Sequence, residues 1–132
     1  MKSEFISILA GVFLGVGQPL MKYGMTSVGI TELSVSVDNI LKVITNLHFL
    51  LGGLISIIGI ISLIIALSGG KASVLKALSG GSTYICILVL SYFLLFEEIT
   101  LFKIIGVSLL IFGIYLLGMI GSFKVKFKEV EK

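Results

Sequence analysis

Charged residues, cysteine and proline are scarce in this chain of 132 residues. Charged residues make up 13% of the sequence, about half of the roughly 25% typical of a soluble domain, and so few charges cannot coat a water-facing surface. This scarcity excludes a soluble enzyme, a disordered tail and a nucleic-acid-binding protein, and a single cysteine excludes a disulfide scaffold. Hydrophobic residues make up 57% of the chain and the mean hydropathy is +1.19, which indicates an integral membrane protein.

Four apolar stretches are long enough to cross a bilayer, because a helix needs about twenty apolar residues to span a hydrocarbon core of about 30 Å. They cover residues 5–25, 47–67, 73–96 and 101–121. None alternates with period two, which excludes a porin-like barrel. The first stretch is too long for a signal peptide and lacks a small-residue cleavage site. The sequence therefore predicts an all-α membrane protein, with one four-helix domain over residues 1–132.

The connections between the spans predict how the helices follow one another. Residues 68–71 and 97–100 form tight turns, so the helices that they join are expected to be antiparallel neighbours. The longer connection, residues 26–46, has a second half whose apolar residues recur at helical spacing behind a possible N-cap at Ser36 or Asp38. This half is interpreted as a short amphipathic helix at the membrane interface, and an ordinary loop is the alternative. The apolar residues concerned are Ile40, Leu41, Ile44 and Leu47.

The distribution of lysines predicts the orientation. Four spans place both termini on one side of the membrane, and a basic tail over residues 122–132 adds to the lysines there. Cytoplasmic loops carry the excess of positive charge, which predicts cytoplasmic termini in the cytoplasmic (inner) membrane. The terminal side holds Lys2, Lys71, Lys76, Lys124, Lys126, Lys128 and Lys132, and the other side holds Lys22, Lys42 and Lys103.

Two lysines lie within the predicted spans, where ionisable groups are costly and are candidates for function. Lys22 lies near the outer end of the first span, with Gln18 one turn earlier on the same face. Lys76 belongs to a polar stripe near the cytoplasmic start of the third span. A cation followed by hydroxyls suits an anionic headgroup such as a phosphate. The alternative for both lysines is snorkelling to the headgroup region. The stripe consists of Ser73, Lys76, Ser79, Gly80 and Thr83.

Other polar residues indicate neither a metal site nor an enzyme. His48 stands alone, without a carboxylate, cysteine or second histidine at ligand spacing. Glu97 and Glu98 close the third span on the outer side, either as a solvated turn or with one of them paired to Lys22 or Lys103. No paired carboxylates, nucleophile with a base or phosphate loop can be assembled from the sequence, so no enzymatic activity and no cofactor are expected.

Glycines at regular spacing predict helix-packing surfaces, because glycine lets helix backbones approach closely. In the fourth span Gly106 and Gly113 stand seven residues apart on one face, which predicts a packing seam within the subunit or between subunits. The second span carries Gly52 and Gly59 on a similar face of small residues.

Three segments resemble the drug/metabolite transporter superfamily. Residues 96–103 (Phe-Glu-Glu-Ile-Thr-Leu-Phe-Lys), followed by Gly106 and Gly113, are similar to its closing helix pair. Residues 16–22 (Val-Gly-Gln-Pro-Leu-Met-Lys) are similar to the first span of its four-helix members, and residues 72–78 lie where its third span begins.

Two four-helix groups of that superfamily compete. Small multidrug resistance exporters carry a glutamate in the first span, but this chain has Leu14 there and no carboxylate between residues 5 and 25. The subunits of the aminoarabinose-lipid flippase have a Gly-Gln followed by a basic residue, which Gly17, Gln18 and Lys22 resemble. The resemblance implies translocation of a polyprenyl-phosphate-linked sugar.

The expected function is therefore that of a transporter or flippase subunit for a lipid-linked anionic substrate, acting as a homodimer or a heterodimer with a similar subunit. The substrate-binding candidates are Gln18, Lys22, Lys76, Ser79 and Thr83, and an anionic headgroup would pass from Lys76 to Lys22. One alternative is a small-molecule or multidrug exporter of the same fold. A second is an accessory membrane subunit that does not itself transport.

Overall fold

The computed structural model describes residues 2–29 and 37–130, and all its regular elements are helices, as predicted. Three of them are long and apolar enough to cross a membrane, namely α1, α3 and α4, and α5 is apolar over Leu101–Leu117. Their length and composition suit a multi-pass membrane protein. In chain order the helices are α1 (Lys2–Ser27), α2 (Val37–Thr45), α3 (Leu47–Ser68), α4 (Ala72–Leu95) and α5 (Leu101–Val130).

The helix boundaries agree with the four predicted spans within a few residues, except at the end of α5. This helix continues to Val130, so it includes most of residues 122–132, which were predicted to be a tail. The segment contains no proline, and lysine and glutamate are good helix formers, so nothing in it ends the helix. In α1 the helix also continues through Pro19.

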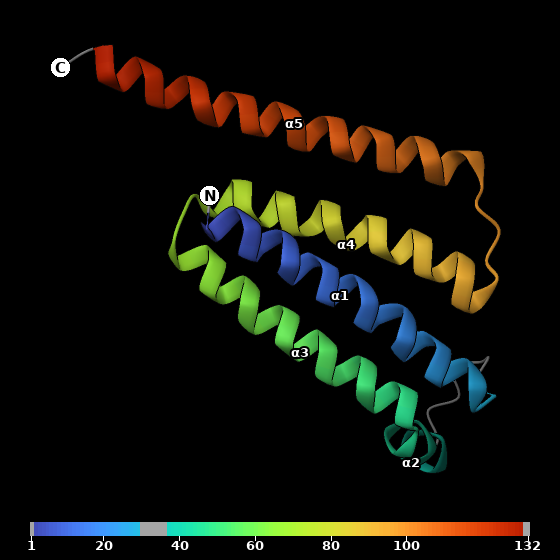
Figure 1. Ribbon diagram of the computed structural model, residues 1–132. Coiled ribbons are helices and arrows are strands. Elements are labelled where there is room, and N and C mark those ends of the chain that lie inside the picture. Colours follow the sequence, from blue (N-terminus) through green and yellow to red (C-terminus); the bar gives the residue numbers. More distant parts are fainter. Residues whose placement is uncertain (1, 30–36, 131–132) are drawn as a thin grey trace.

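The long helices lie side by side in the order α3, α1, α4, α5 (Figure 1). α1 is thus the central helix, although it comes first in the chain. α5 runs antiparallel to α4, as the turn over residues 97–100 predicted, and α3 runs antiparallel to α1 (Figure 1). The turn over residues 68–71 was expected to make α3 and α4 neighbours, and this expectation is wrong: α1 packs between them, because its glycines let it contact both helices closely. α1 and α4 run parallel (Figure 1). The closest approaches of their backbones pair Ser7 with Leu75, Gly11 with Ser79 and Gly15 with Thr83, each 68 residues apart.

Glycines allow α1 to contact two helices at once. A Cβ atom at Gly15 would lie 2.7 Å from the carbonyl oxygen of Thr83 in α4. A Cβ atom at Gly17 would lie 2.6 Å from the carbonyl oxygen of Gly52 in α3. Distances this short are incompatible with a side chain, so these glycines set the spacing between the helix backbones. The packing role predicted for Gly52 is confirmed.

Hydroxyl groups reinforce the contact between α1 and α4. The Ser82 hydroxyl donates a hydrogen bond to the carbonyl oxygen of Ile8 at 3.1 Å, and the Thr83 hydroxyl donates to that of Gly11 at 3.0 Å. The Ser7 hydroxyl donates to the carbonyl oxygen of Leu75. Such bonds between helices are a common means of association in a bilayer, where the hydrophobic effect contributes little between apolar helices.

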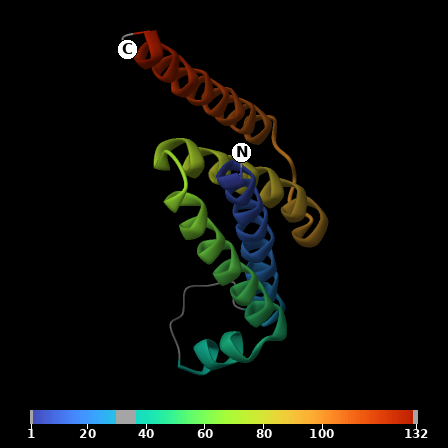
Figure 2. The ribbon, with the colours of Figure 1, turned by 60° about the vertical axis from the view of Figure 1, so that its left-hand side comes forward.

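The predicted short helix is present as α2, which runs across the axes of α1 and α3 (Figure 2). Two details of the prediction are wrong. The helix begins at Val37, so Asp38 lies within its first turn and is not the N-cap, and Leu47 belongs to α3. The other N-cap candidate, Ser36, lies outside the described residues. α3 begins directly after α2 because the Asn46 side chain accepts hydrogen bonds from the backbone N–H groups of His48 and Phe49 at 2.9 and 3.3 Å.

The apolar residues of α2 remain exposed. Ile40, Leu41 and Ile44 are each about half accessible or more within the described chain. An apolar face on a helix that crosses the bundle axis suits the membrane interface, where that face would enter the acyl region. The interfacial position itself stays a prediction.

Candidate functional site

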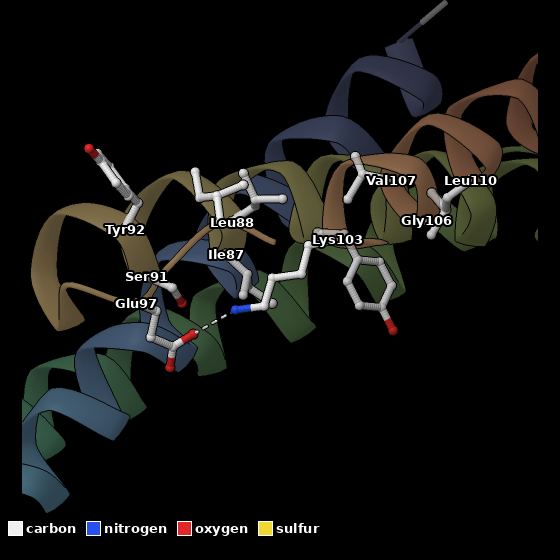
Figure 3. A pocket seen from close by; sticks show the side chains of 11 residues that line it. Ile87, Leu88, Ser91, Tyr92, Glu97, Lys103, Gly106, Val107 and Leu110 are labelled. Carbon is white, nitrogen blue, oxygen red and sulfur yellow. Dashed lines mark ion pairs between the residues drawn. The ribbon is translucent and has the colours of Figure 1, made fainter. Parts of the chain in front are cut away.

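Two cavities lie between α4 and α5. One cavity of about 320 Å³ is lined by Tyr84, Ile87 and Leu88 of α4 and by Val107 and Leu110 of α5 (Figure 3). A second cavity of about 540 Å³ adjoins it along the same helix pair and shares Tyr84 and Leu110. We refer to the two cavities together as the α4–α5 groove. Its lining is mainly apolar side chains and glycine, with the polar residues Ser91, Glu97 and Lys103 in the first cavity.

Glycines keep the groove hollow. Gly106 lines the first cavity, and Gly80 and Gly113 line the second. A Cβ atom at any of the three would meet no neighbouring atom within 4 Å. Gly106 and Gly113, predicted to form a packing seam, therefore face α4 across open space in this subunit. Their role between subunits stays a prediction.

A cluster of three charged side chains joins the end of the groove to α1. We call Lys22, Glu97 and Lys103 the charged cluster. Lys22 Nζ pairs with Glu97 Oε1, and Lys103 Nζ lies 3.5 Å from Glu97 Oε2. The prediction that one of the two glutamates pairs with Lys22 or Lys103 is confirmed, and Glu97 contacts both lysines. The cluster carries one excess positive charge.

Glu97 and Lys103 close one end of the first cavity and point toward one another, with Val107 and Leu110 further along (Figure 3). The hydrogen bond from Lys22 lowers the pKa of Glu97, and the charges of Lys22 and Lys103 act in the same direction. The carboxylate therefore remains ionised at neutral pH. Lys103 Nζ also donates a hydrogen bond to the backbone carbonyl oxygen of Glu98 at 3.2 Å.

The end of α4 places Glu97 at this position. Phe96 has a φ of 51°, which is the left-handed conformation that ends many helices. The backbone N–H groups of Phe96 and Glu97 both donate to the carbonyl oxygen of Ser91. The helix thus ends at Phe96, and the Glu97 side chain contacts Lys22 near the end of α1.

The structure separates the five predicted substrate-binding residues into three places. Gln18 and Lys22 are exposed in the second half of α1, and Lys22 belongs to the charged cluster. Lys76 is exposed near the start of α4, at the opposite end of the bundle. Ser79 is buried, and Thr83 is half-buried and donates hydrogen bonds to the carbonyl oxygens of Gly11 and Ser79. These two residues lie in the contact between α1 and α4.

The apolar lining of the groove could not be identified from the sequence. Tyr84, Ile87 and Leu110 are ordinary residues of apolar spans, and nothing in the sequence sets them apart. The recurring glycines of α5 were the one feature of the sequence that could have indicated the groove.

His48, predicted to stand alone, lies beside another aromatic ring. The centre of its ring is 5.3 Å from that of Tyr23, in an edge-to-face contact. No group of three metal-ligating side chains occurs in the described part of the chain.

The segments that resemble the drug/metabolite transporter superfamily are spread over three helices. Residues 16–22 form the second half of α1, and residues 72–78 form the start of α4. Residues 96–103 contribute Glu97 and Lys103 to the charged cluster. Comparisons with family models, curated proteins and solved structures give no match for this chain, so its membership of the superfamily stays a hypothesis.

Proposed function

We propose that the protein is a subunit of a transporter or flippase that moves a lipid-linked anionic substrate, such as a polyprenyl-phosphate-linked sugar, across the cytoplasmic membrane. The supporting observation is that the apolar α4–α5 groove ends at the charged cluster, which has one excess positive charge. An amphipathic anionic lipid needs an apolar surface for its chain and cations for its headgroup. The groove and the cluster offer the two side by side.

An exporter of cationic drugs is less well supported. Such an exporter needs a carboxylate that is available to a cation, and residues 5–25 contain none. The carboxylate that lines the groove, Glu97, is already paired with Lys22 and Lys103. An accessory subunit that does not transport is also less well supported, because it does not need a groove that glycines keep open.

The proposed path has a cation at each end. Lys76 and Lys22 lie at opposite ends of the bundle because α1 and α4 run parallel. With cytoplasmic termini, Lys76 would receive the headgroup on the cytoplasmic side, and Lys22 would receive it on the outer side. A second subunit, identical or similar, would enclose the groove, which is open along its length.

The test is translocation in reconstituted vesicles with a fluorescent polyprenyl phosphate, measured by quenching of the outer leaflet with a reductant that does not cross the membrane. We expect wild-type protein to accelerate exchange, and the double variant Lys22→Gln with Lys76→Gln to reduce the rate at least about tenfold, as for the loss of two charge-assisted contacts. Lys42→Gln is the matched control, since Lys42 is an exposed lysine on α2. Unchanged translocation in the double variant would refute the proposal.

A further inference from the structure

Glu97 is held by two cations from different helices. Its Oε1 atom pairs with Lys22 of α1, and its Oε2 atom lies 3.5 Å from Nζ of Lys103 in α5. One carboxylate thus bridges two ammonium groups with its two oxygens. A phosphodiester also presents two charged oxygens on one atom, and can bridge the same pair of lysines.

The two lysines and the glutamate differ in how they are attached. Lys22 and Lys103 are carried by long helices, whereas Glu97 belongs to the connection of five residues between α4 and α5. The lysine side chains are 55% and 49% exposed, so an outside ligand can reach both ammonium groups. Ion pairs this exposed are weak, which makes the carboxylate replaceable.

We infer that Lys22 and Lys103 form a binding site for the anionic phosphodiester headgroup of a lipid, and that Glu97 occupies this site until the headgroup displaces it. The inference rests on the proposed function, because it assigns the headgroup site of the same groove. Exchange of one anion for another leaves each lysine paired with an anionic oxygen and does not change the net charge of the cluster. Glu97 then acts as a built-in competitor that weakens binding and eases release of the lipid.

The position of the site favours a lipid over a free anion. Glu97 and Lys103 form one end of the first cavity, whose other lining residues are mainly apolar. A lipid with a phosphodiester headgroup makes contacts between its acyl chains and this lining, whereas inorganic phosphate interacts only with the lysines. A zwitterionic lipid of the same chain length makes the same apolar contacts in the groove, but its own cation competes with the lysines for its phosphate.

The experiment compares equilibrium binding of dioctanoyl phosphatidylglycerol, dioctanoyl phosphatidylcholine and inorganic phosphate to the full chain in neutral detergent. We expect Glu97→Gln to bind phosphatidylglycerol about two- to fivefold more tightly than wild type, the gain that removal of a weak competing ion pair allows. Lys22→Gln and Lys103→Gln should each bind it more weakly. The matched control is Glu98→Gln, which changes the net charge equally at the neighbouring exposed position.

Several results would overturn the inference. Glu97→Gln could bind phosphatidylglycerol no more tightly than Glu98→Gln does, which would reduce the effect to net charge. Inorganic phosphate could bind as tightly as the lipid, which would indicate an anion site independent of the groove. If Glu97→Gln does not fold, weaker binding to Lys22→Gln and Lys103→Gln, with Lys42→Gln unaffected, still decides whether the lysines hold the headgroup. The binding measurements are separate from translocation, so a protein that flips lipid but shows none of the expected changes in binding contradicts only this inference.

Discussion

At the scale of single residues, two adjacent glycines of α3 differ sharply in their surroundings. A Cβ atom at Gly52 would lie 2.7 Å from the carbonyl oxygen of Gly17 and 2.8 Å from the backbone nitrogen of Met21 in α1. At Gly53 it would meet no atom within 4 Å. The same methyl group is therefore expected to destabilise the protein at Gly52 and to have little effect at Gly53.

We predict that Gly52→Ala lowers the free energy of unfolding by about 1–3 kcal/mol, because the backbone of α1 must move away from the added methyl group. Gly53→Ala, the matched control, should remain within about 0.5 kcal/mol of wild type. Unfolding of the two variants in mixed micelles of increasing denaturing detergent measures the difference. Equal stability of both variants would show that α1 and α3 do not pack in this way.

Residues of the candidate site were predictable to different degrees. The pairing of Glu97 with a lysine was one of two open interpretations, and the structure selects it. Ser79 and Thr83 share a helical face with Lys76, but that pattern does not show whether the face meets a ligand or another helix. Their contact with α1 could be known only once α1 was placed against α4.

At the scale of helices, α4 and α5 leave space between them. Gly113 lines the larger cavity of about 540 Å³, and an added Cβ atom there meets nothing within 4 Å. We predict that Gly113→Leu fills this space and slows translocation of the fluorescent polyprenyl phosphate severalfold, without lowering the stability of the protein.

The control for this prediction is Gly53→Leu, which adds the same side chain at an open glycine of α3, a helix that does not line the groove. It should leave translocation unchanged. Equal rates for wild type and Gly113→Leu would mean that the groove does not carry the lipid. Loss of an oligomer in Gly113→Leu alone would instead support the subunit seam predicted for this glycine.

The helices themselves follow from the sequence, and their lateral order does not. Apolar length predicted three spans within a few residues, and the start of the fourth. The turn over residues 97–100 predicted that α4 and α5 are antiparallel neighbours. The turn over residues 68–71 predicted the same of α3 and α4, but α1 packs between these two helices. The central place of α1 depends on glycines on two of its faces, toward α4 at Gly15 and toward α3 at Gly17, and no local pattern assigns each face its partner.

At the scale of the whole molecule, the charged cluster connects α1, the connection after α4 and the start of α5. The pKa of Glu97 is lower in the folded protein than in the unfolded chain, first because of the hydrogen bond from Lys22. The stability that Glu97 contributes is therefore complete above its unfolded pKa. It is lost as the pH falls from there through the folded pKa.

We predict that wild-type protein loses more stability than Glu97→Gln when the pH is lowered from about 7 to about 3. Other carboxylates titrate equally in both proteins, so the difference between the two curves isolates Glu97. Unfolding in neutral detergent at a series of pH values measures it. Parallel curves for wild type and Glu97→Gln would contradict the prediction.

The sequence by itself indicated a membrane protein, the helical class and the approximate extent of the spans. These depend on composition and on runs of apolar residues along the chain. Only the tertiary structure decided that Glu97 joins Lys22 to Lys103, that hydroxyls of α4 bind α1, and that glycines of α5 border a hollow groove. The physical reason is that lateral packing of apolar helices depends on the fit of small residues and on hydrogen bonds between distant positions. Hydropathy along the chain carries no information on either.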